Sequence, residues 1–473
     1  MKSWKEECGV FAIWNHPDSA KLTYLGLYAQ QHRGQESCGI VTLHQKQHII
    51  HKGLGLVGDV FNDKNLSLLT GHAAIGHVRY STTGQNLIAN AQPLTSNLLN
   101  GPVALAHNGN IVNQSILREA LQREGSIFQG TNDTEILLHL MARNPSNDLL
   151  TAFTESAEQL VGAYSFVVMS EDRILAARDP LGFRPLVLGQ LQSDLGISYV
   201  IASESCAFDL IGAEYIREIE PGEILEISSV GLKSKKMNVD ESMYSQKQAP
   251  CVFEHVYFSR PDSNVFGMSV YESRKKFGEQ LAIESGVDAD LVIPIPDSGI
   301  AAALGFSQKS GIPFEFGIIR NHYVGRTFIQ PAQAIRDFGV RVKLNAQANV
   351  LKGKKVIVID DSLVRGTTSQ KIILLLKQAG ATEVHMRIAS PPTIGPCYYG
   401  VDTPEKSQLI ASHQSIDEIK NFIGADSLSY LSLEGMFKAL SRSPKTFCSA
   451  CFSGEYPTSL KGVVKKEKLE ITV

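Results

Sequence analysis

Two adjacent carboxylates, Asp360 and Asp361, directly follow a four-residue apolar run at residues 356–359. The run is too short for a helix and is β-branched throughout, so it predicts a buried strand of a parallel sheet. A turn rich in hydroxyl groups and a helical pattern at residues 371–380 come next. The N–H groups at the start of a helix can bind a phosphate, and the carboxylates suit ribose hydroxyls or a hydrated Mg²⁺. The alternative is an ordinary strand end followed by a helix cap.

This order of residues resembles the phosphoribosyl pyrophosphate (PRPP) signature of type I phosphoribosyltransferases, which combines an apolar run, two acids and a Gly-Thr-Thr loop. The resemblance implies a parallel-sheet α/β domain that binds PRPP with one Mg²⁺ per subunit. The residues that it assigns to the ribose and the 5′-phosphate are Asp360, Asp361, Arg365, Gly366, Thr367, Thr368 and Ser369.

A second polar loop, with Asp297 and Ser298, follows the strand-like residues 291–295. Parallel α/β sheets bind ligands at the carboxyl ends of their strands. By resemblance this loop holds the pyrophosphate, and Ser298 joins Asp360 and Asp361 at the Mg²⁺. Taken alone, its Pro-Asp-Ser-Gly sequence is equally typical of a turn.

A long arginine-rich stretch at residues 318–345 predicts a lid over this domain. In the resembled family the matching segment closes over PRPP, and Arg326 and Lys343 are the residues expected to make charge contacts. A solvated basic loop is the alternative.

The first cysteine, Cys8, precedes an apolar, strand-like run. A lone cysteine in such a place is usually a small buried hydrophobe. Here, however, polar clusters between strand-like segments follow it at residues 31–37, 76–84, 105–113 and 131–135. Two of them also have structural explanations, since Asn108-Gly109 is typical of a hairpin turn and residues 132–135 match a helix capping box.

These clusters resemble the glutaminase domain of class II, N-terminal-nucleophile amidotransferases, in which the cysteine is residue one of the mature chain. The resemblance implies an αββα sandwich that uses L-glutamine. It makes Cys8 the nucleophile and its α-amino group, with a pKa of about 8, the base, once residues 1–7 are removed as a propeptide. It assigns the oxyanion to Asn108 and Gly109, and the glutamine contacts to Arg79, Thr82 and Asp133.

Four more of the seven cysteines form a further candidate site, namely Cys251, Cys397, Cys448 and Cys451. In a long chain without a signal peptide, metal or catalytic roles outrank disulfides. The Cys-x-x-Cys pair fits zinc, redox or iron–sulfur chemistry. The four positions match the ligands of a [4Fe–4S] cluster in Bacillus-type members of the PRPP-using amidotransferases. By this resemblance we expect a cluster that ties the C-terminal segment to the linker.

We expect a propeptide at residues 1–7, a glutaminase domain at 8–235, a polar linker at 236–250 and a phosphoribosyltransferase domain at 251–473. The formal net charge of −3 gives no electrostatic reason to expect a nucleic acid partner. No apolar run approaches the length of a membrane span, and residues 1–7 lack a signal sequence, so we expect a cytoplasmic protein. The resemblance also implies feedback inhibition by purine nucleotides and a homotetramer.

Together, these resemblances imply an enzyme that hydrolyses glutamine at Cys8 and transfers the ammonia to C1 of PRPP, at the start of purine nucleotide synthesis. One alternative is a sugar-phosphate amidotransferase of the same N-terminal class, which the PRPP signature disfavours. Another is a non-catalytic, PRPP-sensing regulator that binds DNA. It would carry a basic helix-turn-helix segment and no N-terminal nucleophile.

Overall fold

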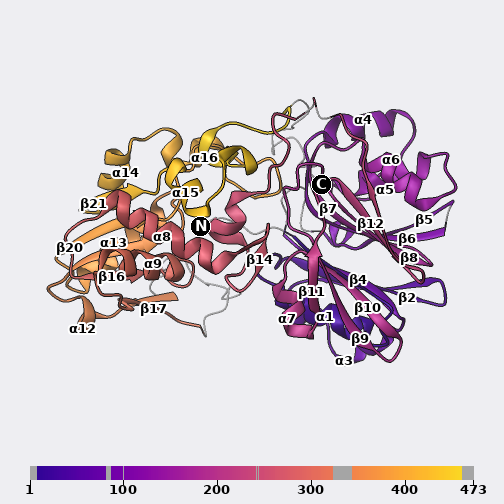
Figure 1. Ribbon diagram of the computed structural model, residues 1–473, viewed down its shortest axis with the longest axis horizontal. Helices are drawn as coiled ribbons and strands as arrows, with labels where there is room; N and C mark the ends of the chain where they lie inside the picture. The colour runs from indigo at the N-terminus through magenta and orange to yellow at the C-terminus, as the bar shows by residue number, and fades with distance from the viewer. Residues whose placement is uncertain are drawn as a thin grey trace.

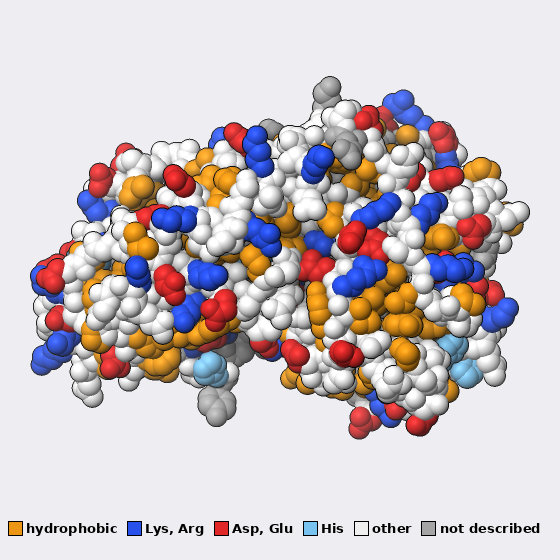
Figure 2. Space-filling model, viewed as in Figure 1, with side chains coloured by type: hydrophobic (Ala, Val, Ile, Leu, Met, Phe, Trp, Pro, Cys, Tyr) orange, Lys and Arg blue, Asp and Glu red, His pale blue; other side chains and the backbone are white. Residues whose placement is uncertain are grey.

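The computed structural model describes residues 8–80, 87–99, 101–240, 242, 244–322 and 343–460, which fold into two lobes lying side by side (Figure 1). The N-terminal lobe, indigo to magenta, is built on two antiparallel sheets, and the C-terminal lobe, mostly orange to yellow, on a parallel sheet. Figure 2 shows acidic and basic side chains interspersed over the visible face of both lobes.

The two sheets of the N-terminal lobe pack face to face around a shared core. Val10 and Val41 come from one sheet, and Ala106 and Val167 from the other. The seven-stranded sheet has the order β11 (Glu214–Glu218), β9 (Val187–Ser193), β10 (Gly196–Ala202), β1 (Gly9–Trp14), β4 (Ala73–Arg79), β2 (Ser37–His44) and β3 (Gln47–Leu54). The six-stranded sheet has the order β13 (Gly231–Lys236), β12 (Glu223–Ser228), β8 (Arg173–Arg178), β7 (Gly162–Met169), β6 (Gly101–Ile111) and β5 (Leu94–Leu98).

Helices cover the outer faces of both sheets. Leu27 of α1 and Phe208 of α7 pack on the seven-stranded sheet. Leu137 of α5 and Phe153 of α6 pack on the six-stranded sheet. The helices of this lobe are α1 (Ser19–Ala29), α2 (Val57–Val60), α3 (Asp63–Leu68), α4 (Gln114–Arg123), α5 (Glu135–Arg143), α6 (Leu149–Ala157) and α7 (Cys206–Ile211), with the 3-10 turn η1 (Ile88–Asn90). The predicted αββα sandwich is therefore confirmed.

The C-terminal lobe has a four-stranded parallel sheet in the order β16 (Leu291–Pro294), β19 (Lys355–Asp360), β20 (Glu383–Ile388) and β21 (Ser427–Tyr430). Successive side chains of β19 enter different cores. Ile357 packs with α8 (Val270–Ser285), α9 (Ile300–Ser310) and α15 (Leu433–Leu440), whereas Val358 packs with α13 (Thr367–Gln378) and α14 (Ile416–Ile423). Both faces of β19 are covered, which explains its continuous apolar sequence.

Short elements complete the second lobe. A π-helix, η3 (Glu254–Phe258), opens it, and the hairpin β14 (Asn264–Val265) and β15 (Met268–Ser269) reaches back to the first lobe. There the Asn264 N–H donates to the Ser205 hydroxyl at 2.8 Å. The others are β17 (Ile318–Arg320), β18 (Leu344–Ala346), α12 (Ala348–Leu351), α16 (Ala450–Ser453) and the 3-10 turns η4 (Lys406–Gln408), η5 (Ile410–Ser412) and η6 (Pro444–Thr446). Within the described ranges, no helix is both long and apolar enough to cross a bilayer.

Candidate active sites

The Cys8 thiol is buried just before β1, with 8% of the residue exposed. Its Sγ donates to the Tyr80 carbonyl oxygen at 3.5 Å. Strand β1 runs antiparallel to β4 with Gly9 opposite Val78, so the register brings Arg79 beside Cys8. The predicted nucleophile and the guanidinium predicted to bind the substrate carboxylate therefore lie at the same end of the sheet.

The predicted oxyanion residues, Asn108 and Gly109, lie inside β6, so the hairpin-turn alternative is wrong. Gly109 has a φ of +148°, and a Cβ there would come within 2.1 Å of a backbone oxygen, so only glycine fits. The Asn108 Nδ2 donates to the Ser203 hydroxyl at 3.3 Å. The Val10 N–H donates to the same hydroxyl at 3.0 Å. One hydroxyl thus joins the amide of Asn108 to the beginning of β1.

Asp133, the predicted ammonium partner, is buried just before α5. Its Oδ2 accepts from the Ile111 N–H at 2.8 Å, and its Oδ1 lies 3.6 Å from His107 Nδ1. Burial acts to raise the pKa of Asp133, but His107 and the Ile111 N–H outweigh burial and lower the pKa. The carboxylate is therefore held in the charged form that an ammonium partner needs. The predicted capping box is half formed, because the Asn132 Oδ1 accepts from the Glu135 N–H at 3.1 Å, whereas the Glu135 carboxylate accepts from the Gln129 and Gly130 N–H groups. Thr82 lies outside the described residues.

Three side chains to which the sequence assigned no role, Gln30, Arg33 and Ser203, lie against the nucleophile strand. The Gln30 Nε2 donates to the Val10 carbonyl at 3.2 Å, and its Oε1 accepts from the Ser203 N–H at 3.1 Å. The Arg33 Nε donates to the Cys8 carbonyl at 3.1 Å. Arg33 belongs to a polar cluster that the sequence singles out, but nothing local marks Ser203, which lies 193 residues from Val10 along the chain.

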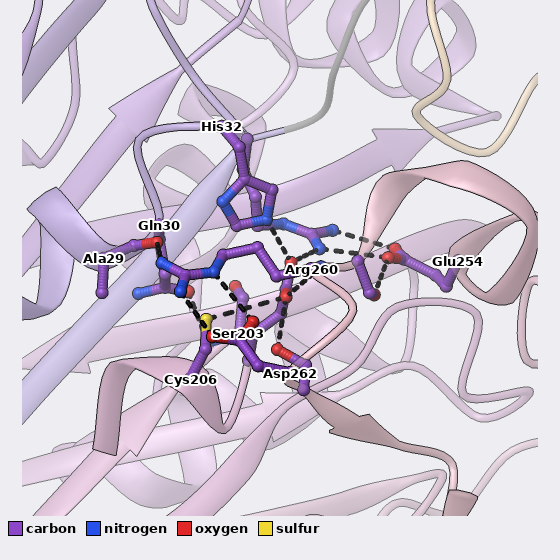
Figure 3. Close-up of polar contacts among 12 residues, drawn as sticks. Ala29, Gln30, His32, Ser203, Cys206, Glu254, Arg260 and Asp262 are labelled. Atoms are coloured by element: carbon purple, nitrogen blue, oxygen red, sulfur yellow. Dashed lines mark hydrogen bonds and ion pairs between the residues drawn. The ribbon is translucent and has the colours of Figure 1, made fainter. Parts of the chain in front are cut away.

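Arg33 also belongs to a buried ion-pair network that joins the two lobes. Figure 3 labels two other members of this network, His32 and Glu254. Arg33 pairs with Glu204 of the first lobe and with Glu254 of η3, with an Nη2–Oε1 distance of 2.9 Å to the latter. Glu254 also pairs with Arg184 at 3.2 Å, and His32 lies 2.7 Å from Glu204. Burial acts to raise the pKa of Glu254, but Arg33 and Arg184 outweigh burial and lower the pKa to about 2.

In the second lobe, Asp360 ends β19 and Asp361 follows it at the carboxyl edge of the sheet. The Asp361 N–H donates to Asp360 Oδ1 at 2.9 Å, and the Asp361 carboxylate accepts from the Ser298 and Ser362 hydroxyls. Burial raises the pKa of Asp360 well above its ordinary value, and the adjacent Asp361 raises it further. Burial also raises the pKa of Asp361. Two poorly solvated carboxylates beside a hydroxyl form an all-oxygen donor set, which fits Mg²⁺.

The predicted phosphate turn forms the N-terminus of α13. Gly366, with a φ of +74°, caps the helix, which begins at Thr367 rather than at the apolar pattern from residue 371. Glycine allows this left-handed conformation, so the helix can start earlier than its apolar face does. Thr367 and Thr368 are exposed in the first turn, where unpaired N–H groups point outward, and Ser369 is buried. Arg365, just before the cap, donates to the Gln408 side chain.

The other residues predicted for this site are only partly described. Asp297 and Ser298 follow β16, which pairs in parallel with β19, so both loops lie at one edge of the sheet. Asp297 forms an ion pair with Arg320 of β17. Lys343 is exposed just before β18. Arg326 belongs to residues 323–342, outside the described part of the chain.

The four cysteines of the third candidate site meet in space. Cys251, Cys397, Cys448 and Cys451 line one small cavity whose other lining residues are apolar or aromatic: Phe183, Phe253, Tyr399, Val401 and Ala450. The Cys448 N–H donates to the Pro250 carbonyl at 2.9 Å, which joins the C-terminal segment to the linker. Burial raises the pKa of Cys451 well above its ordinary value, and the three neighbouring thiols raise it further.

The four thiols match the ligand set of a [4Fe–4S] cluster, which takes one thiolate at each iron. The number, type and apolar surroundings of the donors therefore fit [4Fe–4S].

The chain is similar to known proteins along nearly its whole length. The family model for a glutamine amidotransferase domain matches residues 77–209. Amidophosphoribosyltransferase 1, chloroplastic, of Arabidopsis thaliana is 52% identical over 96% of this chain and 79% of its own. The amidophosphoribosyltransferase of Bacillus subtilis is 49% identical over 97% and 96%. A solved structure of the B. subtilis glutamine PRPP amidotransferase, complexed with ADP and GMP, has a TM-score of 0.90 at 49% identity and covers 97% of this chain and 99% of its own.

Proposed function

The chain belongs to the amidophosphoribosyltransferase family, and from this premise we propose that it converts PRPP, L-glutamine and water into 5-phospho-β-D-ribosylamine, L-glutamate and pyrophosphate. This reaction commits PRPP to purine nucleotide synthesis. The observation that carries the proposal is the Ser203 hydroxyl, which accepts from both Asn108 and Val10 and so holds an oxyanion donor against the strand that begins after Cys8.

In the first lobe, the Cys8 thiolate attacks the γ-carboxamide carbon of glutamine. The free α-amino group of Cys8, exposed after removal of residues 1–7, takes the thiol proton and returns it to the leaving ammonia. The Asn108 side-chain amide and the Gly109 N–H stabilise the oxyanion. Water then hydrolyses the thioester to glutamate. Arg79 and Asp133 hold the substrate carboxylate and ammonium, and Thr82 adds a hydrogen bond.

In the second lobe, Asp360 and Asp361 hold the ribose hydroxyls of PRPP, and the turn from Arg365 to Ser369 surrounds the 5′-phosphate. Asp297 and Ser298 contact the pyrophosphate, with Arg326 and Lys343 closing over it. Mg²⁺, held at Ser298, Asp360 and Asp361, would neutralise the leaving pyrophosphate. Ammonia attacks C1 while the C1–O bond to pyrophosphate breaks, with inversion. Ammonia must reach C1 without protonation, so we propose a closed apolar passage between the lobes.

A [4Fe–4S] cluster held by Cys251, Cys397, Cys448 and Cys451 is part of the proposal. The shared apolar cavity of these cysteines supports it. The cluster would fasten the C-terminal segment to the linker. We also propose regulation by purine nucleotides, a homotetramer and a cytoplasmic location. The ADP and GMP in the B. subtilis structure support the first of these.

Separate assays of the two half-reactions test the proposed function. The wild-type protein should release pyrophosphate from Mg²⁺-PRPP with either glutamine or free ammonia. Cys8→Ala should abolish the glutamine-dependent reaction and retain the ammonia-dependent one, whereas Cys38→Ala, at a buried thiol of β2, should retain both. A Cys8→Ala protein that still used glutamine, or that lost both reactions, would contradict the division into two sites.

A further inference from the structure

A loop of the second lobe, residues 397–400, touches the oxyanion strand of the first lobe directly. The Asn110 Nδ2 donates to the Tyr398 carbonyl at 2.9 Å. Gly400 packs against Gly109 so closely that a Cβ on Gly400 would lie 3.2 Å from both the Cα and the carbonyl carbon of Gly109. The contact is between two backbones, and Asn110 follows Gly109 immediately in β6. The loop therefore contacts both the proposed oxyanion donor and its neighbour.

The same loop is held firmly on its other side. The Tyr399 carbonyl accepts from Nε and Nη2 of the buried Arg184, at 2.9 and 2.6 Å. The Tyr399 ring stacks on Phe183 with ring centroids 4.1 Å apart, and the Tyr399 backbone N–H donates to Cys397 Sγ at 3.3 Å. Neither lobe can shift here without breaking buried contacts. The loop can therefore act as a fixed support for β6.

The position of Gly109 matters because its N–H would stabilise charge that appears only as the tetrahedral intermediate forms. Oxyanion donors work over a narrow range of distances, and loss of one costs roughly 10²–10³-fold in kcat. Gly109 has no side chain to anchor it. Its φ of +148° is a backbone conformation that residues with a side chain rarely adopt. Its backbone is held by the pairing of β6 with β7, where Gly109 lies opposite Tyr164, and in addition by the packing of Gly400 against it.

We propose that Gly400 of the second lobe and Asn110 of β6, through its hydrogen bond to the Tyr398 carbonyl, are positioning residues for glutamine hydrolysis that fix the Gly109 N–H. This inference rests on the proposed roles of Cys8, Asn108 and Gly109. A displaced oxyanion donor weakens transition-state binding more than substrate binding, so kcat for glutamine should fall while KM changes little. Ammonia-dependent synthesis, which needs no oxyanion, should be unaffected.

Gly400→Ala tests the contact, with Gly454→Ala as its matched control. Both glycines have positive φ, +108° and +77°, so alanine is strained at both positions. Only Gly400 faces Gly109, since nothing lies within 4 Å of a Cβ at Gly454. We expect Gly400→Ala to lower kcat for glutamine by roughly tenfold or more, with KM within about twofold of wild type. Gly454→Ala should behave as wild type, and both variants should retain ammonia-dependent synthesis.

A binding readout separates positioning from general damage. Glutamate γ-semialdehyde adds reversibly to a cysteine thiol, and the S–C bond forms as the aldehyde oxygen moves into the oxyanion site. Iodoacetamide alkylates the same thiol by displacing iodide, with no oxyanion. Gly400→Ala should weaken aldehyde binding by roughly tenfold and leave the alkylation rate at Cys8, followed by peptide mass, unchanged. Asn110→Ala, which removes the hydrogen bond to Tyr398, should weaken aldehyde binding by less than Gly400→Ala does and should also leave the alkylation rate unchanged.

The outcomes separate a failure of the positioning inference from a failure of the proposed function. If wild type hydrolyses glutamine but Gly400→Ala and Asn110→Ala match Gly454→Ala, the positioning inference is wrong. Equal losses of glutamine- and ammonia-dependent activity in Gly400→Ala would also overturn it, since they indicate general damage. If Gly400→Ala does not fold, Asn110→Ala decides alone. If wild type hydrolyses no glutamine at all, the proposed function fails first.

Discussion

Arg33 and Glu254, 221 residues apart in the chain, form a fully buried two-contact ion pair across the lobes, with distances of 2.9 and 3.0 Å. The same guanidinium donates through Nε to the carbonyl of Cys8. Glu254 of the second lobe therefore holds Arg33, and Arg33 in turn holds the backbone of the nucleophile Cys8. Both groups are desolvated, so the pair depends on its geometry and its further partners, Glu204 and Arg184.

Low pH should weaken the ion pair between Arg33 and Glu254. The pKa of Glu254 is about 2 in the folded chain against about 4.5 when unfolded, so its ionised form favours the folded state. That contribution is complete above pH 4.5 and is lost as the pH falls toward 2. Urea unfolding of wild type between pH 5 and pH 2 should show this decline.

Glu254→Gln should reduce that pH dependence, leaving the part that Glu204 contributes beside the same arginine, and should lower stability at neutral pH, because it leaves Arg33 and Arg184 short of a carboxylate. Glu119→Gln, which breaks an exposed pair with Arg123, is the control and should leave the pH dependence unchanged. An equal decline with pH in wild type and Glu254→Gln would show that Glu254 does not carry the effect.

Asp360→Ala should abolish pyrophosphate release with glutamine and with ammonia alike. The reason is that Asp360 and Asp361 together form the proposed ribose and Mg²⁺ site. Calorimetry should show loss of Mg²⁺-PRPP binding, while alkylation of Cys8 by iodoacetamide continues as in wild type. Asp417→Ala, at an exposed carboxylate of α14, should keep full activity. Turnover of PRPP by Asp360→Ala would reject the assignment.

Cys451→Ser should lose the brown colour and the iron of the purified protein, since the cluster would lack one of its four thiolates. Cys206→Ser, at a buried thiol of the first lobe, should keep both. Iron analysis of anaerobically purified protein is the measurement. Colourless wild-type protein that contains zinc instead of iron would refute the cluster.

The mature enzyme should begin at Cys8. Only a free amino group on that residue can act as the base for its thiol, so the intact mass of active protein should lack residues 1–7. Glutaminase activity should rise in step with the shortened form during maturation. Full activity in a preparation that retains all seven residues would remove the α-amine from the mechanism.

The elements that the sequence predicts correctly here are those that depend on patterns of neighbouring residues. The strand before Asp360, the phosphate turn and the apolar periodicity of α13 depend on neighbouring residues, and each is confirmed as an element. Even there, the helix begins earlier than its apolar face indicates, because Gly366 can adopt a left-handed cap.

Contacts between distant segments could not be predicted in the same way. Ser203 reaches β1 because β10 pairs with β1, and Glu254 reaches Arg33 because the lobes dock. Neither residue lies in a pattern that marks it. At Asn108-Gly109 the local pattern was misleading. The dipeptide is typical of turns, but it lies inside β6, where pairing with the neighbouring strand fixes its backbone.

The ion pair between Arg33 and Glu254 also bears on the order in which a ribosome makes the chain. A nascent chain that ends before residue 254 already contains Cys8, yet Arg33 lacks its cross-lobe carboxylate and β6 lacks the Tyr398 carbonyl. An unfinished or truncated polypeptide therefore carries a glutaminase whose supports are missing. The first lobe therefore gains its full set of buried contacts only when the second lobe has been made.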